Sequence, residues 1–167
     1  MSAADLSPVL ADLLGVPVEM EERPAADIAL RDLPSLAGPP ESPSVGVYLH
    51  GEDGPGCQML LVFPREDARA LGELLMGPGV EAAAILDVCR EVGNVLAGCY
   101  LSEIADRRRG RLTPTTPQST VDMAGAIISS VLAASPPAGI RSLSIRLQAP
   151  DRVIGATLLL LEAEGDT

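Results

Sequence analysis

The stretch VGVYLHGEDGPGCQMLLVF, residues 45–63, begins with alternating side chains, passes through a glycine-rich turn and ends in an apolar run. Alternation with a period of two is typical of β-strands, and Gly, Pro and Asp between two such runs are typical of a hairpin turn. Residues 143–161, LSIRLQAPDRVIGATLLLL, show the same pattern. The sequence therefore predicts two β-hairpins, one in each half of the chain.

A second correspondence precedes each hairpin. An Ala-Asp pair followed by a glycine and then a proline occurs at residues 11–12 and again at 105–106. Together with the two hairpins, this pattern predicts a structural unit that occurs twice, in residues 1–79 and 80–167. The total of 167 residues suits a single domain better than two.

Helical patterns lie between and beside the hairpins. Residues 65–76 are rich in Ala, Leu and Glu, and a longer helix is expected from about 80 to 109, before a glycine. Residues 119–133 predict a further helix, with Thr120 as its cap and an apolar stripe along one side. The proline-rich run 24–43 predicts a loop with a short interrupted element.

Composition limits the possible partners and location. The chain holds 12 Lys and Arg against 23 Asp and Glu, a formal net charge of −11. Nucleic-acid binding depends on Lys and Arg displacing counterions from phosphates, so a nucleic-acid partner is not expected. No stretch reaches the roughly 20 apolar residues that span a bilayer, and residues 1–12 lack the basic start of a secretory signal. We therefore expect a cytoplasmic protein.

Three cysteines and one histidine offer no clear metal or nucleophilic site. Cys57, Cys89 and Cys99 have no CxxC spacing, and a thiolate zinc site needs four convergent ligands. We expect Cys89 and Cys99 to be buried as small apolar residues and Cys57 to be structural or incidental. His50 has no plausible Ser or Cys partner, so we expect it on the surface and not as a catalytic base.

The predicted helix 80–109 separates into two faces on a helical wheel. An apolar stripe is expected to face the core: Ile85, Val88, Cys89, Val92, Val95, Leu96 and Cys99. Opposite lies a row at spacings of three and four: Asp87, Glu91, Asn94, Gly98, Leu101 and Ala105. This row holds no Lys or Arg for its two acids, and glycine costs roughly 1 kcal/mol inside a helix. The row is either a docking surface beside a shallow notch or a solvated face whose glycines serve packing.

A family resemblance bears on this row. The pattern Asp87-x-x-x-Glu91-x-x-Asn94, followed after 22 residues by Pro117, resembles the signature of the CheC/CheX/FliY-type chemotaxis phosphatases. The surrounding run EVGNVLAGCYLSEIAD also resembles this family, and the likeness extends over most of the chain. The resemblance implies an α+β fold, an α/β two-layer arrangement in which long helices pack on an antiparallel sheet of about six strands.

The same resemblance implies a function. Members of the family hydrolyse the aspartyl phosphate of a phosphorylated CheY-like response regulator. In this chain Asn94 would orient the attacking water, and Glu91 would hold the regulator through its active-site lysine. Asp87, Gly98 and Leu101 would contribute to docking. The chain would need no cofactor of its own, because Mg²⁺ is expected on the partner regulator.

The chain departs from the CheC pattern in the number of sites. CheC-type members carry two such sites, and the repeat offset puts the counterpart of Asn94 at or before Met1, so we expect a single site. The alternative is a non-catalytic scaffold of the same family that binds a receiver domain or the flagellar switch. The basic run 107–109 would complement the helix dipole, or contact an acidic receiver or a modulator such as CheD. The sequence does not fix the oligomeric state.

Overall fold

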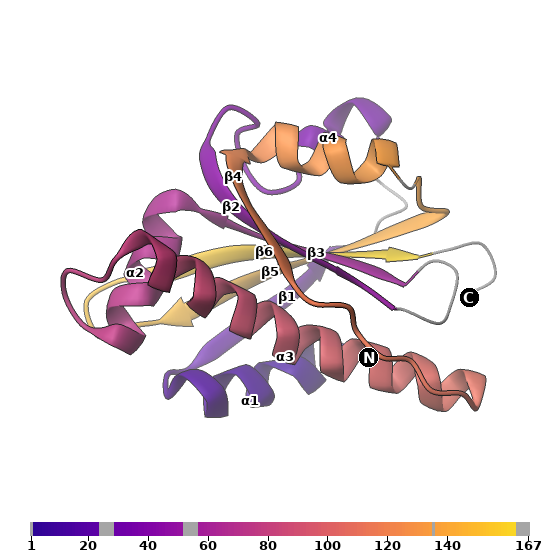
Figure 1. The fold of residues 1–167 in the computed structure, drawn as a ribbon, viewed down its shortest axis with the longest axis horizontal. Helices are drawn as coiled ribbons and strands as arrows, with labels where there is room; N and C mark the ends of the chain where they lie inside the picture. Colours follow the sequence, from indigo (N-terminus) through magenta and orange to yellow (C-terminus); the bar gives the residue numbers. More distant parts are fainter. Residues whose placement is uncertain (1, 24–28, 52–56, 135, 163–167) are drawn as a thin grey trace.

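The computed structural model describes residues 2–23, 29–51, 57–134 and 136–162, and shows helices packed on a β-sheet (Figure 1). The elements in chain order are α1 (Ala3–Leu14), β1 (Val18–Arg23), the 3-10 helix η2 (Leu30–Ser35), β2 (Pro43–His50), β3 (Gln58–Pro64), α2 (Arg65–Met76), α3 (Ala82–Arg108), β4 (Gln118–Met123), α4 (Ala124–Ala134), β5 (Gly139–Gln148) and β6 (Val153–Glu162).

The six strands form one antiparallel sheet in the order β1-β5-β6-β3-β2-β4. Both predicted hairpins are confirmed, as β2–β3 and β5–β6, and they meet at the central pair of β3 and β6. At one edge β1 lies beside β5, and at the other β4 lies beside β2. Strand order does not measure how closely the two halves superimpose, so the units 1–79 and 80–167 stay a prediction.

Helices lie on both faces of the sheet. In Figure 1 α1, α2 and α3 lie on one side of the strands, and α4 lies on the other together with the segment that contains η2. The predicted α+β class, with helices packed on a six-stranded antiparallel sheet, is confirmed. The longest helix is α3, with 27 residues, and its predicted span of about 80–109 is close to its observed bounds.

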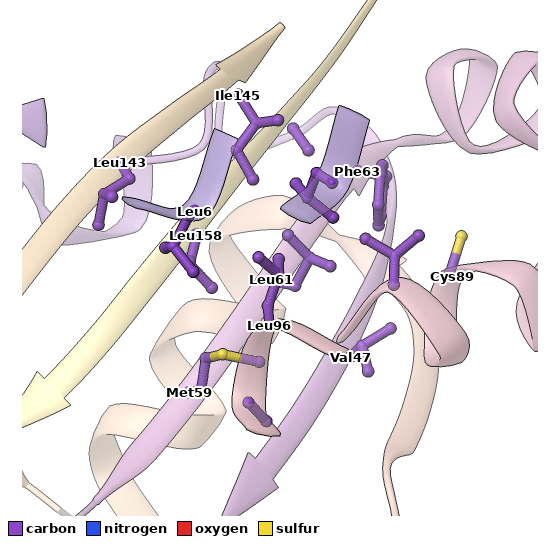
Figure 2. Packing of buried hydrophobic residues seen from close by; sticks show 14 of the residues in the cluster. Leu6, Val47, Met59, Leu61, Phe63, Cys89, Leu96, Leu143, Ile145 and Leu158 are labelled. Carbon is purple, nitrogen blue, oxygen red and sulfur yellow. The ribbon is translucent and has the colours of Figure 1, made fainter. Parts of the chain in front are cut away.

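Alternation along the central strands divides the core in two. Met59, Leu61 and Phe63 of β3 point toward α1, α2 and α3 and join the larger cluster, part of which Figure 2 shows. Leu60 and Val62 point to the opposite face and pack with α4. The apolar run of this strand is therefore explained by burial on both faces.

The predicted helix at residues 119–133 is wrong in its first part. Residues 118–123 form β4, and the helix begins only at Ala124. All six residues of β4 pair with β2, which places Thr120 opposite Gly46 in the sheet and not at a helix cap. The hydrogen bonds gained along this edge outweigh the helical periodicity that continues through the strand.

The remaining local predictions can be compared directly. The helix Arg65–Met76 is confirmed, and η2 is the short element expected in the proline-rich run, of which residues 24–28 lie outside the described part. Cys57 and Cys89 are buried, Cys99 is partly buried and His50 is exposed. None of the helices in the described residues has the length and apolar character needed to cross a membrane.

Candidate functional site

Most residues of the site lie on helix α3. Its core-facing side is buried at Cys89, Val92 and Leu96, which belong to the larger core cluster. Gly93 permits close contact with the sheet, since a Cβ at this position would lie 2.8 Å from Cγ1 of Val47 in β2. This packing fixes the rotation of the helix and turns its opposite face toward solvent.

The exposed face of α3 borders a shallow depression of about 610 Å³. Six residues line it: Asp87, Arg90, Glu91, Asn94, Thr116 and Pro117. The first four come from α3, and the last two come from the segment that leads into β4. All four positions of the sequence signature, including the distant Pro117, therefore lie around one concave surface.

Glu91 and Asn94 are both exposed. Among the described residues, neither side chain has a hydrogen-bond or ion-pair partner. The carboxylate of Glu91 can accept hydrogen bonds from a cation, and the amide of Asn94 can donate and accept at once. Both groups are available to a molecule that enters the depression.

Asp87 is engaged within the chain. Its carboxylate pairs with a terminal nitrogen of Arg90, three residues on, and its side chain remains 70% exposed. The other terminal nitrogen of Arg90 donates a hydrogen bond to Oγ of Ser119 in β4 at 2.6 Å. The expectation that the acids of this face lack a basic partner is therefore wrong for Asp87, because Arg90 reaches it from beside the row.

Sequence reasoning missed Arg90, Ser119 and Thr116. Arg90 lies three residues after Asp87 and four before Asn94, which makes it a neighbour of both on a helix. That spacing was the available signal for Arg90. No local pattern pointed to Ser119 or Thr116, because their proximity depends on how the chain returns to the sheet after α3.

The prediction of Leu101 as a docking residue is wrong, because its side chain is only 2% exposed. After α3 the chain folds back, and Leu101 and Leu112 both lie near Gly51. Hydrogen bonding between Thr115 and His50 holds this returning segment against the end of β2. The C-terminal part of the predicted row is therefore covered by the chain itself.

Gly98 lies one turn after Asn94 and is only partly buried. A Cβ built on it would meet nothing within 4 Å, apart from its own helix backbone. Gly93 and Gly98 thus differ: the first serves packing on the sheet, and the second leaves a notch in the surface of α3. A docking role for Gly98 stays a prediction.

Two further features bear on the chemistry. Burial raises the pKa of the Cys89 thiol to about 12, so this cysteine stays protonated on the core-facing side of α3 and does not act as a nucleophile. Arg107 pairs with Glu103 on α3, and the side chain of Arg108 lies outside the described part. Within the described residues, no group of three or more His, Cys, Asp or Glu side chains could hold a metal ion.

Comparison with known proteins finds a curated relative. The chain is 27% identical over 139 residues to the CheY-P phosphatase CheC of Bacillus subtilis (strain 168), a match that covers 79% of this chain and 66% of that protein. No protein-family model matches the chain.

Solved structures share the fold at low identity. Thermotoga maritima FliY has a TM-score of 0.60 and 11% identity, covering 93% of this chain and 81% of FliY. A CheX–CheY–BeF3–Mg²⁺ complex from Borrelia burgdorferi matches with a TM-score of 0.57 and 18% identity, covering 93% of this chain and 92% of the matched chain. The FliM–SpeE complex from H. pylori matches with a TM-score of 0.56 and 12% identity, covering 96% of this chain and 81% of the matched chain. The sequence likeness to CheC and the shared fold confirm that this chain resembles the CheC/CheX/FliY-type chemotaxis proteins.

Proposed function

We propose that this chain hydrolyses the aspartyl phosphate of a CheY-like receiver domain in chemotaxis signalling. The observation that supports the proposal most directly is the convergence of Asp87, Glu91, Asn94 and Pro117 on one depression. These positions match the phosphatase signature, and the curated relative is described as a CheY-P phosphatase. The CheX structure with the same fold was solved with CheY, BeF3 and Mg²⁺.

The chemistry requires little of the phosphatase itself. An aspartyl phosphate is an acyl phosphate and is already labile, so hydrolysis needs a water held in line with the phosphorus and no protein nucleophile. Asn94 is exposed and its amide is unengaged within the described part, so it can enter the receiver's site and orient that water. Mg²⁺ bound to the receiver would neutralise charge on the phosphoryl oxygens.

Glu91 supplies the electrostatic contact with the receiver. Its exposed carboxylate lies one turn from Asn94 and has no ion-pair partner among the described residues. A lysine in the receiver's phosphorylation site would form a charge-assisted hydrogen bond with it. Gly98 would let the receiver approach the helix backbone closely. A contribution of CheD remains an expectation from the family resemblance.

The alternative function is a scaffold that binds a receiver or the flagellar switch without catalysis. The observation that favours it is the likeness in fold to FliM, at a coverage of 96% of this chain. Binding without hydrolysis would need the same exposed face of α3 but would not depend on the amide of Asn94.

The test measures the decay of a phosphorylated CheY-type receiver with and without the chain, alongside binding of the beryllofluoride-loaded receiver. We expect the wild-type chain to speed this decay. Glu91→Gln should lower the affinity for the receiver about tenfold, because one charge-assisted hydrogen bond is lost. Arg146→Gln, on the far face of the sheet, is the control with unchanged affinity. If the receiver binds tightly but its aspartyl phosphate decays no faster than without the chain, the phosphatase proposal fails and the scaffold function takes its place.

A further inference from the structure

The side chain of Arg90 connects two elements beside the depression. It donates a hydrogen bond to Oγ of Ser119, the second residue of β4, at 2.6 Å. It also pairs with Asp87, one turn earlier on α3. The Arg90 side chain is 35% exposed, so it is partly shielded from water.

These contacts lie close to the two sides of the site. Arg90 precedes Asn94 by one helical turn, and Ser119 follows Pro117 by two residues. The hydrogen bond therefore ties the turn of α3 that carries Asn94 to the strand that begins directly after Pro117. Loss of this bond would let the two sides of the depression separate.

The residue types fit such a connection. Arginine has a rigid, planar set of donors that can bond two acceptors in different directions, whereas the ammonium of lysine is a compact point charge. Asp87 holds one terminal nitrogen, which orients the other toward Ser119. Because the carboxylate of Asp87 is used in this way, Glu91 is left as the acid that can meet a cation of the partner.

We propose that Asp87, Arg90 and Ser119 form a positioning unit that fixes the separation of Asn94 and Pro117. The inference rests on the proposed function, since its consequence is the placement of the water-orienting amide. The unit acts through Asn94 and does not contact the phosphoryl group. It gives Asp87 a role inside the chain in place of the docking role that the sequence suggested.

The kinetic test uses Ser119→Ala and Arg90→Gln. We expect kcat for receiver dephosphorylation to fall about tenfold in each, because small displacements of a positioning group are costly, with receiver affinity changed less than about twofold. The double variant should be no slower than Arg90→Gln alone, since both changes break one connection. Arg90→Lys should recover only part of the rate, and Arg146→Gln should match the wild type.

A different pattern would overturn the proposal. If Ser119→Ala keeps the wild-type kcat while Arg90→Gln weakens receiver binding, then Arg90 contacts the receiver directly and does not act through Ser119. Full recovery by Arg90→Lys would also contradict it, because a charge alone would then suffice.

A second measurement on the free protein separates this inference from the proposed function. We expect the backbone amides of Gln118 and Thr120, which face β2 in the ladder, to exchange hydrogen several-fold faster in both variants than in the wild type and in Arg146→Gln. Unchanged exchange would overturn the positioning unit even if the wild type proves an active phosphatase. If no receiver is dephosphorylated, the proposed function fails, and the exchange rates still decide whether Arg90 holds β4 against α3.

Discussion

Two glycines of α3 have different physical reasons to be glycine. At Gly93 an added Cβ would lie 2.8 Å from Val47 Cγ1 and 3.4 Å from Leu49 Cδ1, so the helix and β2 would have to move apart. At Gly98 the same atom would meet open space. Helix propensity favours alanine at both positions by roughly 1 kcal/mol, and packing opposes it only at the first.

Alanine substitutions at these positions should therefore have opposite effects. We expect Gly93→Ala to lower the free energy of unfolding by about 1 kcal/mol, because overpacking exceeds the gain in helix propensity. Gly98→Ala should raise it by up to about 1 kcal/mol. Urea unfolding followed by circular dichroism measures both. Equal stabilisation by the two variants would show that α3 lies farther from β2 than the structure places it.

At the level of single residues, the sequence predicted only part of the site. Helical spacing and the family signature correctly brought Glu91 and Asn94 to an exposed face, because one rigid helix carries both. The wheel failed for Leu101, since it cannot show which part of a helix the chain later covers. Ser119 could not be predicted, because it reaches Arg90 only through the pairing of β4 with β2.

At the scale of elements, β1 is an edge strand held by charge as well as backbone pairing. The guanidinium of Arg141 in β5 donates hydrogen bonds to both carboxylate oxygens of Glu22 in β1, at 2.7 and 3.0 Å. These bonds lower the pKa of Glu22 below its ordinary value of 4.5. A lowered pKa means that the contribution is present above the unfolded value and is lost as the pH falls through the folded value.

Glu22→Gln should therefore destabilise the protein at neutral pH and have less effect in acid. We expect a loss of roughly 0.5–1 kcal/mol at pH 7, a size suited to a pair that is partly exposed to solvent. Well below pH 4.5 wild type and variant should converge, because Glu22 is then protonated in both the folded and unfolded states. Urea midpoints at several pH values measure the difference. A gap that stays constant from neutral to acid pH would contradict the assignment.

Element boundaries were predictable where the chain's own signals were strong. The hairpins follow from alternation and turn residues, and α2 follows from its composition between a strand and a glycine. β4 was missed because its six residues carry little alternation in hydrophobicity, and five of them are exposed. Its pairing with β2 is a long-range contact that no local window contains.

At the scale of the whole molecule, the sheet lies between two hydrophobic cores and contributes side chains to both. The larger cluster lies under α1, α2 and α3, and the smaller lies under α4. Both use the central strands β3 and β6, whose successive side chains enter opposite clusters. The fold class could be predicted from the hairpins and family resemblance, but the placement of α4 on the second face depends on the chain path after β4.

Because the cores share their central strands, they should unfold together. Leu71→Ala in α2 and Ile128→Ala in α4 each remove a fully buried side chain, one from each cluster. We expect either change to cost about 2–5 kcal/mol and to lower the midpoint of one common transition. Circular dichroism and tyrosine fluorescence should report coincident urea curves. Two separate transitions in either variant would show that the faces are independent units.

The most direct test of the central claim compares wild type and Asn94→Ala at saturating concentrations with a phosphorylated CheY-type receiver. The positioning role predicts that wild type accelerates decay and that Asn94→Ala loses at least about tenfold of that acceleration, with binding of the beryllofluoride-loaded receiver preserved. Acceleration by Asn94→Ala equal to that of the wild type would contradict the assignment of this amide as the group that orients the attacking water.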